Sequence, residues 1–219
     1  MSRIDLVDLD IDDDEIQNMF TAVTAMLGRV PNSYKVLAHS PLVAKMLVPF
    51  NAVVQREGAG SVLSTKIKEM VVIKTSHLNG CKYWFAHNTS LGQAAGITDE
   101  QTIEIGTDEY LESDLFNARE KAAILWATHV TQNTAKEDNG IYEQVHQEFT
   151  EQEMVDLTMI CCFFNFFNRL TDSLKIPVEE KDEVDKIKRS VRLNPDKVKS
   201  YLQTTVENWP ESFPEPNPD

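Results

Sequence analysis

The sequence of 219 residues has little of three things: cysteine, basic side chains and long apolar runs. Its three cysteines are an odd number, which does not build a disulfide framework in a chain of this length. Its 21 basic residues stand against 35 acidic ones, and the net charge of −14 repels phosphate backbones and anionic lipid. No apolar run reaches the length of a membrane span. We therefore expect neither nucleic acid nor a membrane as a partner.

The first residues, MSRIDLVDLDIDDDE, are acidic and lack the basic and apolar regions of a signal peptide. Together with the sparse cysteine, they predict a cytoplasmic protein in a reducing compartment. With 42% hydrophobic and 26% charged residues, the composition is that of a globular protein with a sizeable core.

Helical periodicity dominates the sequence, and no segment alternates apolar and polar residues as a strand does, so we predict an all-α fold. Capping boxes at Thr98/Gln101 and Thr150/Glu153 mark two helix starts, and Gly80 suits a helix end. The predicted helices cover 12–27, 41–55, 64–79 and 81–95, with a short one after 98, a long one after 150 and a last one after 194.

We divide the chain into a helical arm (1–30), a core (31–177) and C-terminal helices with an extended, proline-rich tail (178–219), within one domain overall. Two segment pairs recur at offsets of 51 and 52 residues. KIKEMVVIKTSHL resembles NAREKAAILWATHV, and GITDEQTIEI resembles EFTEQEMVDL. This predicts an internally duplicated helical unit. Chance similarity between helices is the alternative.

Cys81 follows Gly80 at a predicted helix start, in the stretch HLNGCKYWFAHN. Unpaired N–H groups and the helix dipole at such a start favour a thiolate, so Cys81 is a candidate reactive thiol. The alternative is a small apolar residue that fills a helix corner. On the helix, Trp84 and Asn88 share the face of Cys81, while His87 shares a side with Tyr83 and Trp84.

Three side chains are candidates for acid–base chemistry. Glu69 lies twelve residues before Cys81 among apolar residues, where burial would raise its pKa; the alternative is an exposed pair with Lys66. His87 is a candidate proton carrier or a hydrogen-bonded histidine at the edge of the core. His77 is a second proton carrier or a residue that the helix C-terminus favours.

Glu69, Cys81 and the AH of NGCKYWFAHNTSLGQAAGIT together resemble the carboxymuconolactone decarboxylase superfamily. RVPNSYKVLAHSPLVAKML, REKAAILWATHV and NFFNRLTDSLKIP extend the similarity, most closely to its alkylhydroperoxidase D-like (AhpD-like), peroxidase-related branch. The resemblance implies an all-helical fold and a homo-oligomer, whether dimer, trimer or hexamer. It also implies a small-molecule substrate and no cofactor.

In the peroxidase branch a glutamate, a Cys-x-x-Cys pair and a later histidine carry out a dithiol cycle. Carried over by position, the resemblance puts Glu69 and Cys81 in the first two roles. Trp84 stands at the second cysteine and Asn88 at the histidine, with His87 one residue early. The usual cycling disulfide therefore cannot form within this motif, because tryptophan has no thiol. Cys161 and Cys162 could in principle form a disulfide with Cys81, but they lie in an apolar run that we interpret as inert core.

Three functions stay open. The first is thiol-dependent hydroperoxide chemistry at Cys81, with Glu69, a histidine and an external thiol reductant. The second is a cysteine-independent acid–base enzyme of the decarboxylase type, with Glu69 and His87 or His77 acting on a small lactone or carboxylate; Tyr83, Trp84 and Asn88 would shape its pocket. The third is a non-catalytic family member. A metal site is not predicted, because Glu143-x-x-His146 is a single motif where di-iron bundles need two.

Overall fold

The computed structural model describes residues 2–213, 215 and 216, and these form helices and no β-strand. A single isolated bridge pairs Glu57 with Arg192. The helices are α1 (Asp14–Leu27), α2 (Asn32–Leu37), α3 (Pro41–Gln55), α4 (Thr65–Asn79), α5 (Lys82–Ala94), α6 (Asp99–Gly106), α7 (Ala118–Thr131), α8 (Ile141–His146), α9 (Glu151–Leu174), α10 (Lys181–Asp185) and α11 (Pro195–Glu207), with the 3₁₀ helices η1 (Glu109–Leu111) and η2 (Lys186–Ser190). The predicted all-α fold is confirmed.

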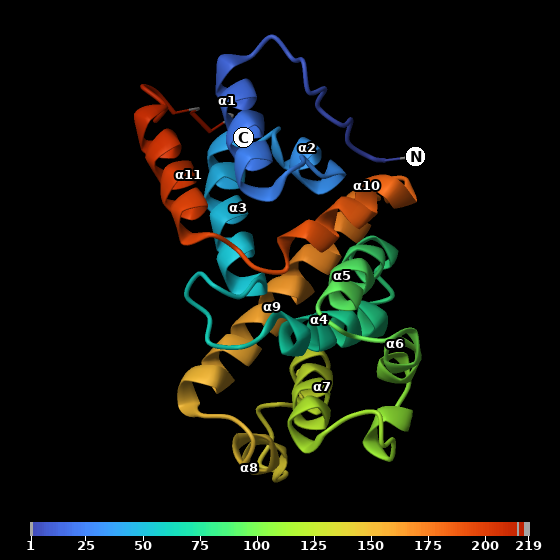
Figure 1. The fold of residues 1–219 in the computed structure, drawn as a ribbon. Coiled ribbons are helices and arrows are strands. Elements are labelled where there is room, and N and C mark those ends of the chain that lie inside the picture. The colour runs from blue at the N-terminus through green and yellow to red at the C-terminus, as the bar shows by residue number, and fades with distance from the viewer. Residues whose placement is uncertain (1, 214, 217–219) are drawn as a thin grey trace.

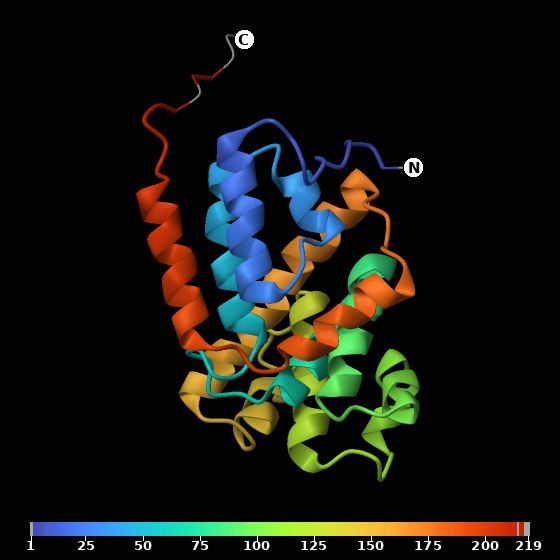
Figure 2. The same cartoon turned by 45° about the horizontal axis from the view of Figure 1, so that its top comes forward.

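Helix α4 lies at the centre of the molecule and packs against α5, α7 and α9 (Figure 1). Helix α11 lies beside α1 and α3 (Figure 2). The segment of α10 and η2 packs across α5. This arrangement brings residues from both ends of the chain over the α4–α5 hairpin. None of the described helices is both long and apolar enough to cross a membrane.

The predicted capping boxes are present, with Thr98 and Thr150 each accepting a hydrogen bond from the N–H three residues on. Gly80 ends α4 in the left-handed conformation (φ 69°), which glycine adopts without a Cβ penalty. A third box, at Asn117 and Glu120, opens α7. Helices α2 and α8 were not predicted, because six residues are too few to show a helical period.

Both repeats of the predicted internal duplication are helical, and α4 packs against α7. Helical similarity alone accounts for this, so the duplication stays a hypothesis. In the predicted tail, 209–213 with 215 and 216 are not helical, and residues 214 and 217–219 lie outside the described residues.

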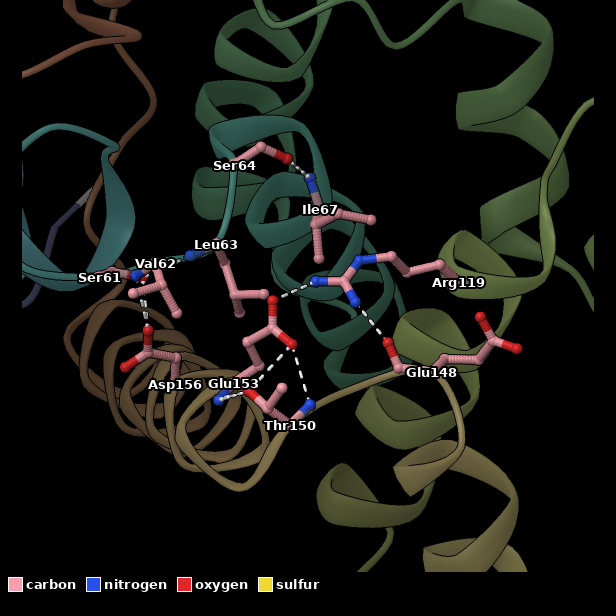
Figure 3. Close-up of polar contacts among 10 residues, drawn as sticks. All are labelled: Ser61, Val62, Leu63, Ser64, Ile67, Arg119, Glu148, Thr150, Glu153 and Asp156. Atoms are coloured by element: carbon pink, nitrogen blue, oxygen red, sulfur yellow. Dashed lines mark hydrogen bonds and ion pairs between the residues drawn. The ribbon is translucent and has the colours of Figure 1, made fainter.

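The loop between α3 and α4 is fastened to α9 (Figure 3). Asp156 accepts hydrogen bonds from the Ser61 hydroxyl at 2.9 Å and from the Val62 N–H at 3.0 Å. Nearby, the Arg119 guanidinium binds Glu153 at 2.5 Å. These polar contacts fasten the α3–α4 loop and the start of α7 to the first turns of α9.

Candidate functional site

Glu69, in the middle of α4, is fully buried. Its Oε1 accepts a hydrogen bond from Gln55 Nε2 at 2.9 Å, while its Oε2 has no partner among the described residues. Burial raises the pKa of this carboxyl to about 8, although the bond from Gln55 and the charges of Arg56 and Lys68 act to lower it. Glu69 is therefore a neutral acid at pH 7, with one oxygen held and the other free. The alternative pair with Lys66 is wrong, because Lys66 binds Glu120 at 2.7 Å.

Gln55, the last residue of α3, connects the groups around Glu69. Its Nε2 also donates to Asn88 Oδ1 at 2.8 Å, and its Oε1 accepts from the Arg56 guanidinium at 3.0 Å. Because arginine can only donate, this contact fixes which way the Gln55 amide points. The amide therefore presents its N–H groups to Glu69 and Asn88. Asn88, at the position of the motif histidine, is a hydrogen-bond acceptor here.

Lys68 is also fully buried, and its Nζ donates to the Arg56 carbonyl oxygen at 2.8 Å. Burial lowers the pKa of Lys68 to about 8, against the opposing charges of Glu69, Asp156 and Glu57. The charges of Arg56 and Lys68 both favour the carboxylate that remains after a proton leaves Glu69.

His87, in α5, binds a carboxylate that the sequence did not point to. Its Nδ1 lies 2.8 Å from the Tyr83 carbonyl oxygen, and its Nε2 lies 3.0 Å from Glu179 Oε2, without the alignment of a hydrogen bond. Glu179 Oε1 accepts from the Asn32 N–H at 2.5 Å and the Tyr83 hydroxyl at 3.0 Å. Burial acts to raise the pKa of Glu179, but His87 and the N–H of Asn32 lower it to about 2.

A small cavity of about 20 Å³ lies beside His87, enclosed by α2, α3, α5 and η2. A volume of this order holds one water molecule. Its polar wall includes Arg29, Tyr34, Asn51, Gln55, Arg56, His87 and Ser190. Gln55 reaches from this wall to Glu69, so the cavity and the buried acid are joined through one side chain.

Trp84, which the resemblance puts at the second cysteine of the family motif, is buried among aromatic rings. The ring is 4% exposed and packs with centroid distances of 5.2 Å to Phe164 and 4.9 Å to Phe167. Its Nε1 donates to the Phe167 carbonyl oxygen at 3.2 Å. The indole of Trp84 is therefore part of the core on the side of Phe164 and Phe167, and it lines the cavity on its other side.

The prediction that Cys81 has thiolate character is wrong. Cys81 is the N-cap residue of α5, and it is fully buried. Burial raises the pKa of its thiol to about 11, which outweighs the lowering by the Thr171 hydroxyl, 3.4 Å from Sγ, and by the N–H of Trp84. The desolvation of a charged sulfur therefore exceeds the effect of the helix start.

All three cysteines are free. Cys161 is buried, as predicted, but Cys162 is exposed and is not core. His77 is exposed at the end of α4, and with Phe85, Lys82 and the backbone beside Cys81 it lines a surface hollow of about 230 Å³. No group of three His, Cys, Asp or Glu side chains suited to a metal occurs in the described part of the chain.

The predicted site residues thus fall into two places. Asn88 joins Glu69 through Gln55, and Tyr83, Trp84 and His87 line the cavity on that side. Cys81 and His77 share the separate hollow, and no hydrogen bond links Cys81 to Glu69. Sequence reasoning missed four residues of the site: Arg29, Gln55, Arg56 and Glu179. Only Arg29 had a signal, because it lies within RVPNSYK, a segment of the family resemblance.

Comparison with known proteins agrees with this fold. Residues 41–129, from α3 through most of α7, match the carboxymuconolactone decarboxylase family. The uncharacterized protein YdfG of Bacillus subtilis (strain 168) is 27% identical over 112 residues, which are 51% of this chain and 75% of that protein.

Two solved structures share the fold. An uncharacterized peroxidase-related protein of Ralstonia eutropha JMP134, with an alkylhydroperoxidase AhpD core, has a TM-score of 0.68 at 22% identity and covers 86% of this chain and 96% of that one. The debrominase Bmp8, as a cysteine-to-alanine variant in complex with 2,3,4-tribromopyrrole, has a TM-score of 0.66 at 19% identity and covers 84% of this chain and all of that one. The chain therefore has the AhpD-like helical fold, and the family match over residues 41–129 supports its placement in the carboxymuconolactone decarboxylase/AhpD-like superfamily.

Proposed function

We propose that this protein is a cysteine-independent acid–base enzyme in which Glu69 transfers a proton to or from a small substrate. The observation that carries the proposal is the state of Glu69: buried, neutral at pH 7 and with one oxygen unpartnered. A carboxylic acid held neutral near pH 7 is suited to general acid catalysis, because it can give up its proton at working pH.

In this mechanism Gln55 holds Oε1 of Glu69, and the proton sits on the free Oε2. The proton passes from Oε2 to the substrate, and a carboxylate is left behind. Arg56 and Lys68 stabilise that charge, since both act on the Glu69 carboxyl through space. Water or product returns the proton at the end of the cycle. Glu69 does not itself line the cavity, so a substrate larger than water has to displace the η2 side, where Ile187 and Ser190 lie, and pass Gln55 to reach the acid.

The test is a panel of small lactones and carboxylic acids assayed by mass spectrometry with the wild type, Glu69→Gln and Cys81→Ser. Gln keeps the shape and the oxygen that Gln55 binds, but it has no transferable proton. Turnover that Glu69→Gln loses and Cys81→Ser keeps supports the proposal. Turnover that survives in Glu69→Gln overturns it. No turnover across the panel, with a folded protein, favours the non-catalytic alternative.

The hollow beside Cys81 supports a second candidate, thiol chemistry on a small electrophile such as an organic hydroperoxide or a brominated pyrrole. Cleavage of a peroxide O–O bond would oxidise the Cys81 thiol to a sulfenic acid, and an external thiol, available in the expected cytoplasm, would reduce it again. The raised pKa of Cys81 counts against this candidate. Turnover in the presence of a thiol reductant that Cys81→Ser abolishes would favour it over the acid–base function.

We also propose that the protein self-associates through the outer faces of α3 and α9. Met46 and Phe50 on α3 and Val155, Met159 and Phe166 on α9 are large apolar side chains that are 37–58% exposed. Exposed apolar side chains at helical spacing on neighbouring helices are typical of subunit interfaces. Light scattering on the wild type and on Phe166→Glu tests this. A monomeric wild type would contradict it.

A further inference from the structure

Helix α11 and the turn after it carry an apolar stripe that the described helices leave uncovered. Its large side chains are exposed, Leu202 by 45%, Val206 by 70% and Trp209 by 49%. Tyr201 and Thr205, further around the helix, are buried against the rest of the fold. Both ribbon views show α11 at the edge of the molecule, beside α1 and α3 (Figures 1 and 2). A contiguous apolar stripe at the edge of a fold is typical of an interaction surface.

A groove of about 700 Å³ runs along this stripe. Val198, Leu202 and Val206 line it from α11. The facing wall is formed by Val53 at the end of α3 and by residues 58–60, Gly-Ala-Gly, in the loop that follows. These three small residues leave the hollow beside α11 open. Because the lining is mainly apolar, the groove is suited to an apolar occupant with few charges.

Two exposed charges mark the two ends of the groove, Lys199 in the first half of α11 and Glu207 at its last residue. They lie about 12 Å apart along the helix axis, at 1.5 Å per residue, and so cannot pair within one chain. An antiparallel copy of α11 would set its glutamate level with this lysine and its lysine level with this glutamate. A parallel copy would set like charges at one level. The charges therefore fit a second α11 in the antiparallel direction.

We propose that α11 pairs antiparallel with α11 of a second copy of this chain, about a twofold axis beside Leu202. In this register Leu202 meets its own counterpart, and Val198 meets Val206 of the second copy. Each contact occurs twice, as in any isologous dimer. Lys199 and Glu207 form two ion pairs at the rim. Because the net charge of −14 opposes the approach of two copies, these pairs also help to set the direction of the helices.

This contact is separate from the self-association proposed above for α3 and α9. It uses α11 and the last turn of α3, not Phe50 or Phe166. An isologous contact closes with one partner, so a protein that used both contacts would contain more than two copies. The pairing is also independent of the acid–base function, because no residue of the candidate site takes part in it.

The experiment is a charge-reversal cycle measured by light scattering over a range of protein concentrations. Lys199→Glu and Glu207→Lys should each weaken the pairing about tenfold or more, because each sets like charges opposite one another twice. The double variant has both pairs in reversed order and should return to the affinity of the wild type. Lys136→Glu, at an exposed lysine between α7 and α8, is the matched control and should associate as the wild type does.

A second measurement locates the twofold axis. Leu202→Cys, in a Cys162→Ser background that removes the exposed thiol, is oxidised with copper phenanthroline. A residue beside a twofold axis meets itself, so this variant should form a disulfide between two copies. Glu112→Cys, at an exposed position between α6 and α7, is the control and should stay unlinked.

A wild type that is monomeric at every concentration overturns the pairing and leaves the groove to a different apolar occupant. Single charge reversals that associate like the wild type overturn it as well. If both reversals weaken association and the double variant does not restore it, the antiparallel direction is wrong. A Leu202→Cys disulfide that persists when Phe166→Glu is added supports a contact separate from that of α3 and α9. None of these measurements uses turnover, so the acid–base function can fail without affecting the pairing.

Discussion

Gln55 Nε2 lies 2.9 Å from Glu69 Oε1, and this contact joins the end of α3 to the middle of α4. The same nitrogen lies 2.8 Å from Asn88 Oδ1, so one amide holds both the buried acid and Asn88, which the resemblance puts at the family histidine. The opposite end of the amide is bound by Arg56. Glu69 therefore has a fixed geometry without a histidine or a cysteine beside it, which is why acid–base chemistry fits this site better than a thiol relay.

Glu69→Gln should change how stability depends on pH. Folding raises the pKa of Glu69 from 4.5 to about 8, so the folded state keeps a proton that the unfolded chain releases. Stability from this neutral carboxyl is complete below pH 4.5 and is lost as the pH rises through 8. Gln does not titrate. The free energy of unfolding, measured in urea, should therefore rise in the variant relative to the wild type by more than about 1 kcal/mol between pH 5 and pH 8.

The matched control for that measurement is Glu112→Gln, at an exposed glutamate, whose difference from the wild type should not vary between the two pH values. Lys68 titrates in another window: burial lowers its pKa from 10.5 to about 8, so its contribution changes above pH 8. If the free energy of unfolding of Glu69→Gln differs from that of the wild type by the same amount at pH 5 and pH 8, Glu69 is ionised in the folded protein.

Glu179→Gln should be strongly destabilising because it removes a buried carboxylate that contacts His87, Tyr83 and Asn32. Removal of one partner from a buried pair costs about 3–5 kcal/mol. Folding depresses the pKa of Glu179 to about 2, so its stabilisation is present above pH 4.5 and is lost as the pH falls towards 2. Urea unfolding at pH 7 and pH 3 measures this, and the destabilisation should shrink at the lower pH.

Its neighbour Glu180 provides the control, because Glu180 is exposed and makes no capping bond at the start of α10. Glu180→Gln should change stability by less than about 0.5 kcal/mol. Equal effects of the two substitutions would mean that the contact between Glu179 and His87 contributes no net stability.

Much of the fold could be predicted from the sequence, because helix signals are local. Periodicity spans three or four residues, and a capping box such as Thr150 with Glu153 lies within one turn. The prediction failed where the local signal was too short, as in α2. The resemblance to the superfamily was visible around Cys81, because a sequence motif, like a helix signal, lies in one continuous stretch.

The site could be predicted only in part, because its geometry depends on distant segments. Glu179 lies 92 residues from His87 in the sequence, within VEEK, which has the composition of an exposed turn. The state of Cys81 depended on a balance between burial and the helix start, and a sequence gives the position of a helix start but not the depth of burial.

Trp84→Ala should cost about 3–5 kcal/mol, because it removes a large ring from contact with Phe164 and Phe167. Trp84→Phe keeps most of the packing and loses the hydrogen bond to the Phe167 carbonyl, which is worth about 1 kcal/mol. Denaturant unfolding measures both. Trp209→Ala, at a tryptophan that is 49% exposed, should stay within about 0.5 kcal/mol of the wild type. If Trp84→Ala lowers the free energy of unfolding only slightly, the neighbouring side chains move in to fill the cavity that the indole leaves.

Native protein treated with a maleimide at pH 7 should be labelled first at Cys162. This is the exposed cysteine, whereas Cys81 and Cys161 are buried and burial raises the pKa of each thiol to about 11. Reaction needs both access and thiolate, so the two buried thiols should react only as the protein opens. Peptide mass spectrometry over a time course identifies the order, and Cys162→Ser should remove the fast phase. Rapid labelling of Cys81 in the folded protein would contradict its burial and would restore the thiol chemistry that the hollow beside His77 supports.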